Sequence, residues 1–226
     1  GGGGMMDFLC FLWRGSGFWQ RVATYDVRHV AVLARMLTRH GGHRLTCAHD
    51  GVELPEGVGS IRMPEHVASL PNYLPKLWAW SPDVHERMSR RFACIDLDVV
   101  ILDDLEPVLA TAAPIRLWNS ARGEPYNSSL FTIEPGHGHD VWSTMTPGRV
   151  AAARARATRW TGDQSWINHV LGPGLPTFGE ETGVIRYMRS LHAHHPPPGT
   201  RAAFLCGPMA PDTEQNFSRW IARSWT

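Results

Sequence analysis

Residues 91–105 read RFACIDLDVVILDDL, an apolar run that turns acidic at its end. The run predicts a buried strand over Arg91–Leu105, with Asp96 and Asp98 two positions apart. In an extended chain, residues i and i+2 share a face and lie roughly 6.5–7 Å apart. Two ionised carboxylates at that separation resist burial unless a cation neutralises them, and Mg²⁺ or Mn²⁺ suits such oxygen ligands. The pair therefore indicates either a metal site or a solvated acidic turn after a core strand.

The residues before this stretch predict a strand–helix–strand unit. Asp7–Trp13 is a short apolar run typical of a buried strand. Apolar residues then recur at helical spacing over residues 24–40, with Thr24 as a plausible cap, and His43–Asp50 reads as a second strand. Such a unit pairs its strands in parallel. Because α/β sheets bind ligands at the carboxyl ends of parallel strands, the acidic pair is expected at a ligand-binding edge.

The residues around and after the acidic pair predict further elements of an α/β sheet. Residues 54–82 are punctuated by prolines, which predicts loops and one short helix near Leu74–Trp80. The tail, residues 191–226, reads mostly as loop with a terminal helix. We find no domain linker, so residues 5–226 are predicted to form a single domain, and the opening four glycines read as a cloning remnant. The remaining predicted elements are strands Ile115–Asn119 and Ser128–Ile133 and helices at about Asp140–Met145 and Asp163–Leu171.

Charge and cysteine content narrow the class of protein. The formal net charge is +1, so no global field indicates nucleic acid or a membrane surface. One local run, Arg149–Arg159, is Ala-rich and basic, which is typical of a solvated helix or of a surface that binds an anionic acceptor or a phosphate. The four cysteines stand far apart, which indicates reduced thiols in a cytoplasmic protein. No apolar stretch approaches the ~20 residues of a membrane span, and no signal peptide is recognised.

The segment IDLDVVILDDLEPVL, which contains the acidic pair, resembles the D-x-D segment of GT-A glycosyltransferases. It is nearest to the branch of glycogenin and the lipopolysaccharide galactosyltransferases, with their bacterial and phage relatives. The resemblance implies a mixed, mostly parallel, Rossmann-like sheet flanked by helices, with D-x-D at a strand end. Further pieces resemble the family in its chain order. They are Trp13-Arg14-Gly15 after the first strand, Cys47-Ala48-His49-Asp50, Pro75-Lys76-Leu77, Tyr126-Asn127-Ser128-Ser129, and Gly162-Asp163-Gln164 through Asn168.

The resemblance also implies roles for these residues. Asp96 would hold the ribose and the metal, and Asp98 would ligate the metal, Mn²⁺ or Mg²⁺, which neutralises the departing diphosphate. Lys76 would contact the donor phosphate or sugar. Gln164 would lie close to the anomeric carbon, as proposed for retaining relatives. The other implied donor contacts are Trp13 and Asp50 at the nucleotide, and Asn127, Ser128 and Asp163 at the sugar.

The sequence departs from the family at the third metal ligand. Relatives carry a histidine in a late F-H-G-x-x-K-P segment, where this chain has Cys206. A thiolate is a soft ligand and is poorly matched to Mn²⁺ or Mg²⁺. The run His192-Ala193-His194-His195 offers substitutes for the missing ligand, or is a solvated loop, and water could fill the site.

The resemblance predicts a metal-dependent transferase that moves a hexose from a nucleoside-diphosphate sugar, with UDP favoured, to an acceptor hydroxyl. Retention is the habit of the branch, although Glu180 or Glu181 could supply a base for inversion. The acceptor stays open among a glycan, a protein, a small molecule and a modified DNA base. Two alternatives compete. One is a haloacid-dehalogenase-type phosphatase with Asp96 as nucleophile, which usually opens with its D-x-D motif and needs a late acidic pair. The other is a GT-A-like module that binds nucleotide sugars without catalysis.

Overall fold

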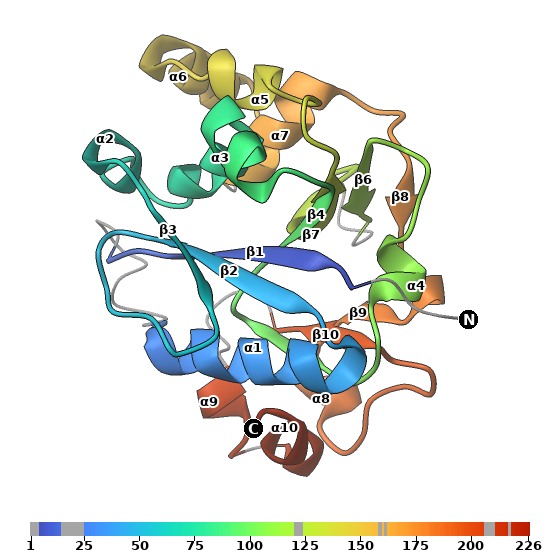
Figure 1. The fold of residues 1–226 in the computed structure, drawn as a ribbon. Helices are drawn as coiled ribbons and strands as arrows, with labels where there is room; N and C mark the ends of the chain where they lie inside the picture. The colour runs from blue at the N-terminus through green and yellow to red at the C-terminus, as the bar shows by residue number, and fades with distance from the viewer. Residues whose placement is uncertain are drawn as a thin grey trace.

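A central sheet of seven strands organises the fold, with helices on both faces (Figure 1). The computed structural model of the protein describes residues 5–14, 25–119, 124–157, 160, 162–205, 211–216 and 218–226. The strand order is β3-β2-β1-β4-β7-β6-β8, and four of the six strand pairings are parallel, as predicted. The strands are β1 Asp7–Leu12, β2 Arg44–His49, β3 Gly59–Arg62, β4 Phe92–Ile95, β6 Ile115–Trp118, β7 Asn127–Ile133 and β8 Thr177–Phe178.

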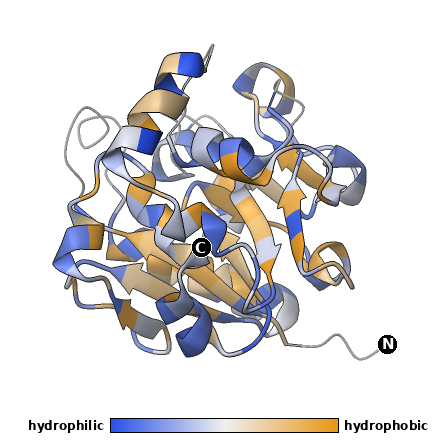
Figure 2. Ribbon diagram, turned by 90° about the horizontal axis from the view of Figure 1, so that it is seen from above, coloured by the Kyte–Doolittle hydropathy of each residue, from blue (hydrophilic) through white to orange (hydrophobic). Residues whose placement is uncertain are grey.

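Strand β1 shows how the sheet separates two hydrophobic cores. All six of its residues are buried, and successive side chains point to opposite faces. Phe8 and Cys10 belong to the core shared with helix α1 (Val27–Gly41), whereas Leu9 and Phe11 belong to the core on the opposite face. In Figure 2, hydrophobic residues concentrate on the strands inside the molecule. A strand buried on both faces reads as the continuous apolar run seen in the sequence.

The predicted strand–helix–strand unit is confirmed. β1 pairs in parallel with β2, with Leu12 opposite His49. The cap of α1 is Asp26, whose side chain accepts a hydrogen bond from the N–H of Arg28, and His29 completes a capping box. Thr24, the predicted cap, lies outside the described residues. Aspartate caps helices as well as threonine does.

The predicted single strand over Arg91–Leu105 is wrong. It divides into β4 and β5 (Val99–Ile101), which belong to different sheets. The second sheet, β5-β10-β9, lies on the α1 side and is completed by β9 (Val184–Arg186) and β10 (Ala202–Phe204). The apolar pattern did not predict this division, because β4 and β5 are both buried and extended. They differ only in the strands with which they pair.

Two regions predicted as loop contain more regular structure. Residues 54–82 hold β3 and helix α2 (Glu65–Ala68) in addition to the predicted short helix, which is the 3₁₀ helix η2 over Leu74–Trp80. The tail supplies β10 besides its terminal helix. The remaining helices are α3 Pro82–Met88, α4 Glu106–Leu109, α5 Asp140–Ser143, α6 Pro147–Arg156, α7 Asp163–Leu171, η3 Glu180–Thr182, α8 Arg189–His192, α9 Pro211–Glu214 and α10 Arg219–Ser224.

The helices divide between the two faces of the sheet. α1 and α8 to α10 lie on the side of the small sheet, and η2, α3 and α5 to α7 lie on the other (Figure 1). Within the described ranges, none of the helices combines the length and apolar character needed to cross a bilayer. Among the described residues, Cys10, Cys47 and Cys94 are buried and do not form disulfides.

Candidate functional site

The D-x-D segment is the link between the two sheets. The N–H of Asp96 donates to the carbonyl of Ser129 at 2.9 Å and so extends the pairing of β4 with β7. The carbonyl of Asp98 accepts from the N–H of Leu205 at 2.8 Å, which extends the pairing of β5 with β10. The backbone bends at residues 97–98, so the extended geometry assumed from the sequence does not apply. Each aspartate is held by a different sheet, and both side chains are half-buried.

Lys76 joins the first aspartate of this link to helix α7. It lies on η2 and is only 6% exposed. Its Nζ forms an ion pair with Asp96 Oδ1 and lies 3.6 Å from Asp163 Oδ2. Burial on its own would lower the pKa of Lys76, but the two carboxylates more than offset it and raise the pKa above its ordinary value. Lys76 is therefore held charged between two acids that are far apart in the sequence.

Asp163 is the first residue of α7, and the backbone turn at Gly162 directs the chain into this helix. Gly162 has φ of +81°, which side-chain-bearing residues rarely adopt, and it turns the chain into the helix. The Asp163 side chain is 4% exposed and interacts with Ser128 and with the N–H of Gln164. Burial raises its pKa and the charge of Asp96 adds to this, against the opposing effect of Lys76. Its Oδ2 atom is buried and receives no hydrogen bond from the described residues.

Tyr73 is a site residue that sequence reasoning missed. It is half-buried directly before η2, and burial raises its pKa, as do the charges of Asp163, Asp96 and Asp98 in that order. All three carboxylates therefore lie close enough to act on one ring. We call Asp96, Asp98 and Asp163, together with Lys76, the acidic cluster. A single tyrosine in a proline-rich stretch matches no motif, so no local signal could have identified it.

The start of β7 comes to the same edge of the sheet because its direction is reversed. β7 runs antiparallel to β4, with Leu130 opposite Ile95, so the first residues of β7 lie beside the end of β4. Asn127 and Ser128, both predicted site residues, are buried there. Asn127 Oδ1 accepts from the N–H of Ser129 at 2.7 Å, which fixes its side chain. The structure thus brings Ser128 into contact with Asp163. Asn127, the residue before Ser128, lies at the same edge of the sheet.

Gln164 follows Asp163 on α7, and its side chain has a partner that was not predicted. Its Nε2 donates to Glu124 Oε2, and the hydroxyl of Ser165 donates to the other oxygen of the same carboxylate at 2.8 Å. Glu124 lies just before β7 and is half-buried. Glu124 belongs to no recognisable motif, so its hydrogen bonds with Gln164 and Ser165 could not be predicted from the sequence.

Trp13 and Asp50 directly follow the paired ends of β1 and β2. The N–H of Arg14 donates to Asp50 Oδ2 at 2.9 Å, and Trp13 is partly buried against the core. Because β1 is parallel to β4, these residues lie along the same edge of the sheet as the D-x-D link. The described contacts do not join them to the acidic cluster itself.

The predicted metal ligands come together only in part. Nowhere in the described ranges do three His, Cys, Asp or Glu side chains form a group that could hold a metal. Cys206 lies outside the described residues, although Leu205, which precedes it, is bonded to Asp98. His194 and His195 are exposed, and His192 Nδ1 accepts from the N–H of Met188 at 3.1 Å. The histidine run therefore does not complete a metal site with Asp96 and Asp98.

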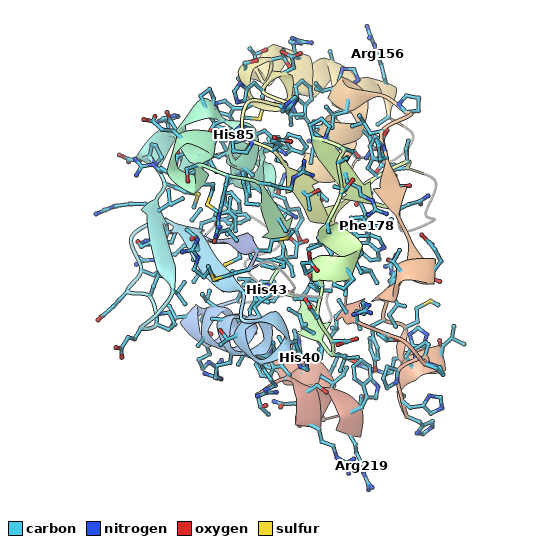
Figure 3. The ribbon with its side chains drawn as sticks, turned by 45° about the vertical axis from the view of Figure 1, so that its right-hand side comes forward. His40, His43, His85, Arg156, Phe178 and Arg219 are labelled. Carbon is cyan, nitrogen blue, oxygen red and sulfur yellow. The ribbon has the colours of Figure 1, made fainter. Side chains whose placement is uncertain are left out.

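The other sequence candidates lie on the surface. The basic run forms helix α6 over Pro147–Arg156, as its Ala-rich composition predicted, and Arg159 lies outside the described residues. Figure 3 shows Arg156 pointing away from the molecule. Glu180 and Glu181 are exposed on η3, and Glu181 Oε1 accepts from the N–H of Gly179 at 2.9 Å.

No protein-family profile and no curated protein sequence matches the chain. Solved structures do match. The galactosyltransferase LgtC in complex with donor and acceptor sugar analogues superposes with a TM-score of 0.67 and 15% identity, over 98% of this chain and 97% of that one. An LgtC active-site mutant, glutamine to glutamate, gives 0.64 and 12% identity over 97% and 96%. The glycosyltransferase GlyE of Streptococcus pneumoniae TIGR4 gives 0.61 and 11% identity, over 98% of this chain and 63% of GlyE. The chain therefore has the GT-A fold, as the resemblance implied.

Proposed function

We propose that this chain is a glycosyltransferase that moves a hexose from a nucleoside-diphosphate sugar to an acceptor hydroxyl. The observation that carries the proposal is the acidic cluster, in which segments from η2, the D-x-D link and α7 converge at the carboxyl edge of β1, β2 and β4. This edge is where open α/β sheets bind ligands. The fold shared with LgtC and GlyE supports the same reading.

The D-x-D carboxylates fit a divalent cation. Asp96 and Asp98 offer oxygen ligands at a half-buried position, and Mn²⁺ or Mg²⁺ commonly bridges one or two carboxylates to substrate phosphates and water. When bound, the metal supplies Lewis-acid stabilisation of the charge on the leaving diphosphate. Lys76 already neutralises part of Asp96, so Asp98 is the proposed principal ligand and Asp96 also holds the donor ribose.

The donor sugar is proposed to lie against Asp163, Asn127 and Ser128. A buried carboxylate oxygen without a hydrogen bond, such as Asp163 Oδ2, is unfavourable unless a ligand supplies a donor, and a sugar hydroxyl does so. Lys76 holds Asp163 in place and contributes a positive charge beside the donor phosphates. Trp13 and Asp50, at the ends of β1 and β2, are proposed to contact the nucleotide, for which UDP is favoured.

Gln164 is proposed to stabilise the positive charge that develops at the anomeric carbon during transfer with retention. Positive charge develops at that carbon as the glycosidic bond breaks, and a carbonyl oxygen beside it lowers the energy of the transition state. A glutamine is also the residue replaced in the active-site mutant of LgtC.

The test is a binding and turnover screen with a matched pair of variants. Isothermal titration with Mn²⁺ and a panel of nucleotide sugars should show metal-dependent donor binding, and nucleotide release should report turnover. Asp98→Ala should lower turnover by about 1,000-fold or more, because a transition-state charge loses its counter-ion. Asp103→Ala, which removes an exposed acid from the same stretch of chain, should leave turnover unchanged.

Three outcomes contradict the proposal. Retained turnover in Asp98→Ala excludes the metal role. Phosphate release from simple esters, without binding of nucleotide sugars, favours a phosphatase. Donor binding that never leads to hydrolysis or transfer favours a binding module.

A further inference from the structure

The segment before β7 is bound to one side of α7 by a set of hydrogen bonds. Glu124 accepts from the side chains of Gln164 and Ser165. Asn168, one turn further along α7, accepts from the N–H of Tyr126 at 2.9 Å and donates to its carbonyl at 2.8 Å. The two hydrogen bonds between the Tyr126 backbone and the Asn168 side chain fix the segment, and Pro125 disfavours a helical backbone at Glu124, which lies at a bend. The Glu124 carboxylate is therefore held in a defined place beside the first turn of the helix.

The Glu124 carboxylate determines which way the Gln164 amide faces. A glutamine side chain has one donor end and one acceptor end, and an ionised carboxylate can only accept. The NH₂ group of Gln164 must therefore face Glu124, as it does, which turns its carbonyl oxygen Oε1 away from Glu124. Without the carboxylate, the Gln164 amide loses the hydrogen bond that holds it in place, so it can rotate by half a turn or turn away from this position altogether.

The end of the Gln164 amide that faces the anomeric carbon matters for the transfer reaction proposed above. The inference therefore rests on that proposal. The oxygen of an amide carries partial negative charge and its NH₂ group partial positive charge. Beside an anomeric carbon that becomes positive, the oxygen stabilises the transition state and the NH₂ group opposes it. A flipped amide therefore does more than remove an interaction, because it reverses its sign.

We propose that Glu124 is a positioning residue that sets the orientation of the Gln164 amide. A purely structural role would be to stabilise α7, whose N-cap residue Gly162 has no side chain to cap the helix, since a negative charge near a helix N-terminus is favourable. The two roles predict different results, because stabilising the helix does not depend on the presence of Gln164.

A double-mutant cycle on kcat separates these roles. Glu124→Ala should lower kcat by about 100-fold, the scale of a misplaced catalytic group, with the KM for the donor within about threefold of wild type. Gln164→Ala should lower kcat by a similar factor, and the double variant should be no slower than Gln164→Ala. Ser165→Ala is the matched control, because it removes the hydrogen bond that Ser165 donates to the same carboxylate and should leave kcat within about threefold.

A more conservative substitution guards the test against misfolding. If Glu124→Ala does not fold, Glu124→Gln keeps the shape of the side chain. Its neutral amide is a weaker acceptor than the carboxylate and holds Gln164 less firmly, so kcat should fall by about 10-fold, between wild type and Gln164→Ala. Reductions that multiply in the double variant, or a Glu124→Ala enzyme with wild-type kcat, overturn the inference.

The side-chain amide signals of Gln164 give a readout that needs no turnover. In ¹⁵N-labelled protein these signals should be shifted from those of a solvated glutamine, should move to the solvated position in Glu124→Ala, and should stay in place in Ser165→Ala. An unchanged Gln164 signal in Glu124→Ala overturns the inference while leaving the transferase proposal standing. Wild-type protein that turns over no donor overturns the transferase proposal, whereas the amide signals still report on Glu124.

Discussion

The two ends of the central sheet each hold a buried aspartate, and the electrostatic environments of the two are opposite. At the amino end, Asp7 pairs with Arg44 at 2.8 Å and with Arg90. Burial alone would raise the pKa of Asp7, but the two guanidinium groups more than offset it and lower the pKa. At the carboxyl edge, burial and a neighbouring carboxylate raise the pKa of Asp163 although Lys76 is near.

The difference lies in how well positive and negative charges are matched at each edge. Two cations balance one acid at the amino edge, whereas in the acidic cluster one lysine is shared by the carboxylates of Asp96 and Asp163. Excess negative charge out of bulk water is unfavourable, and natural proteins retain such arrangements mainly at functional sites. The amino edge stabilises the fold, and the carboxyl edge is the one that we propose binds a cation and a substrate.

Replacing one cation at each edge is the strongest way to test this contrast. Lys76→Met should lower the free energy of unfolding by about 3 kcal/mol, because it leaves the carboxylates of Asp96 and Asp163 without their shared counter-ion. Arg44→Met removes an exposed partner from Asp7 and should cost less than about 1 kcal/mol. Denaturant unfolding at neutral pH measures both.

Manganese sharpens the same comparison. A cation that binds the native state alone raises its stability, so Mn²⁺ should restore part of the loss in Lys76→Met and have no such effect on Arg44→Met. Equal losses in the two variants, or an equal response to Mn²⁺, would show that the edges do not differ.

Much of the fold around the carboxyl edge could be predicted from local sequence, whereas the pairing of Asp7 with Arg44 and Arg90 was not predicted. The apolar run before Asp96, the amphipathic helix after β1 and the helix start at Asp163 are patterns of neighbouring residues, and the structure has β1, α1, β2 and α7 where they were predicted. The parallel pairing followed from the strand–helix–strand order, and it brings the predicted residues to one edge of the sheet.

The missed features depend on contacts between distant segments. The division of Arg91–Leu105 into β4 and β5 depends on pairing with β7 and with β10, which is more than 100 positions later in the sequence. Tyr73 and Glu124 act through residues 23 to 90 positions away, so no motif marks them. Lys76 was expected to contact the donor, but its ion pairs with Asp96 and Asp163 could be seen only in the folded chain.

Replacing the aspartate at the carboxyl edge should stabilise the protein. The raised pKa of Asp163 means that its surroundings disfavour the charged form, so the neutral Asp163→Asn should increase the free energy of unfolding by about 1–2 kcal/mol at neutral pH. Transfer activity should fall in the same variant, because the proposed sugar contact is altered. Thermal unfolding and nucleotide release measure the two effects, and a destabilised Asp163→Asn would contradict this account of the carboxyl edge.

The matching substitution at the amino edge should have the opposite sign and a defined pH dependence. Asp7→Asn should lower the free energy of unfolding by about 1 kcal/mol at neutral pH, because the charged form is favoured by Arg44 and Arg90. A folded-state pKa below the ordinary 3.8 means that this stabilisation is complete above about pH 4 to 5 and is lost as the pH falls through the folded-state pKa. Denaturant unfolding of both proteins at a series of pH values should therefore show two curves that converge on acidification. A difference that stays constant or grows toward acid pH would mean that the arginines do not hold Asp7 in its charged form, and the electrostatic contrast between the two edges would be lost.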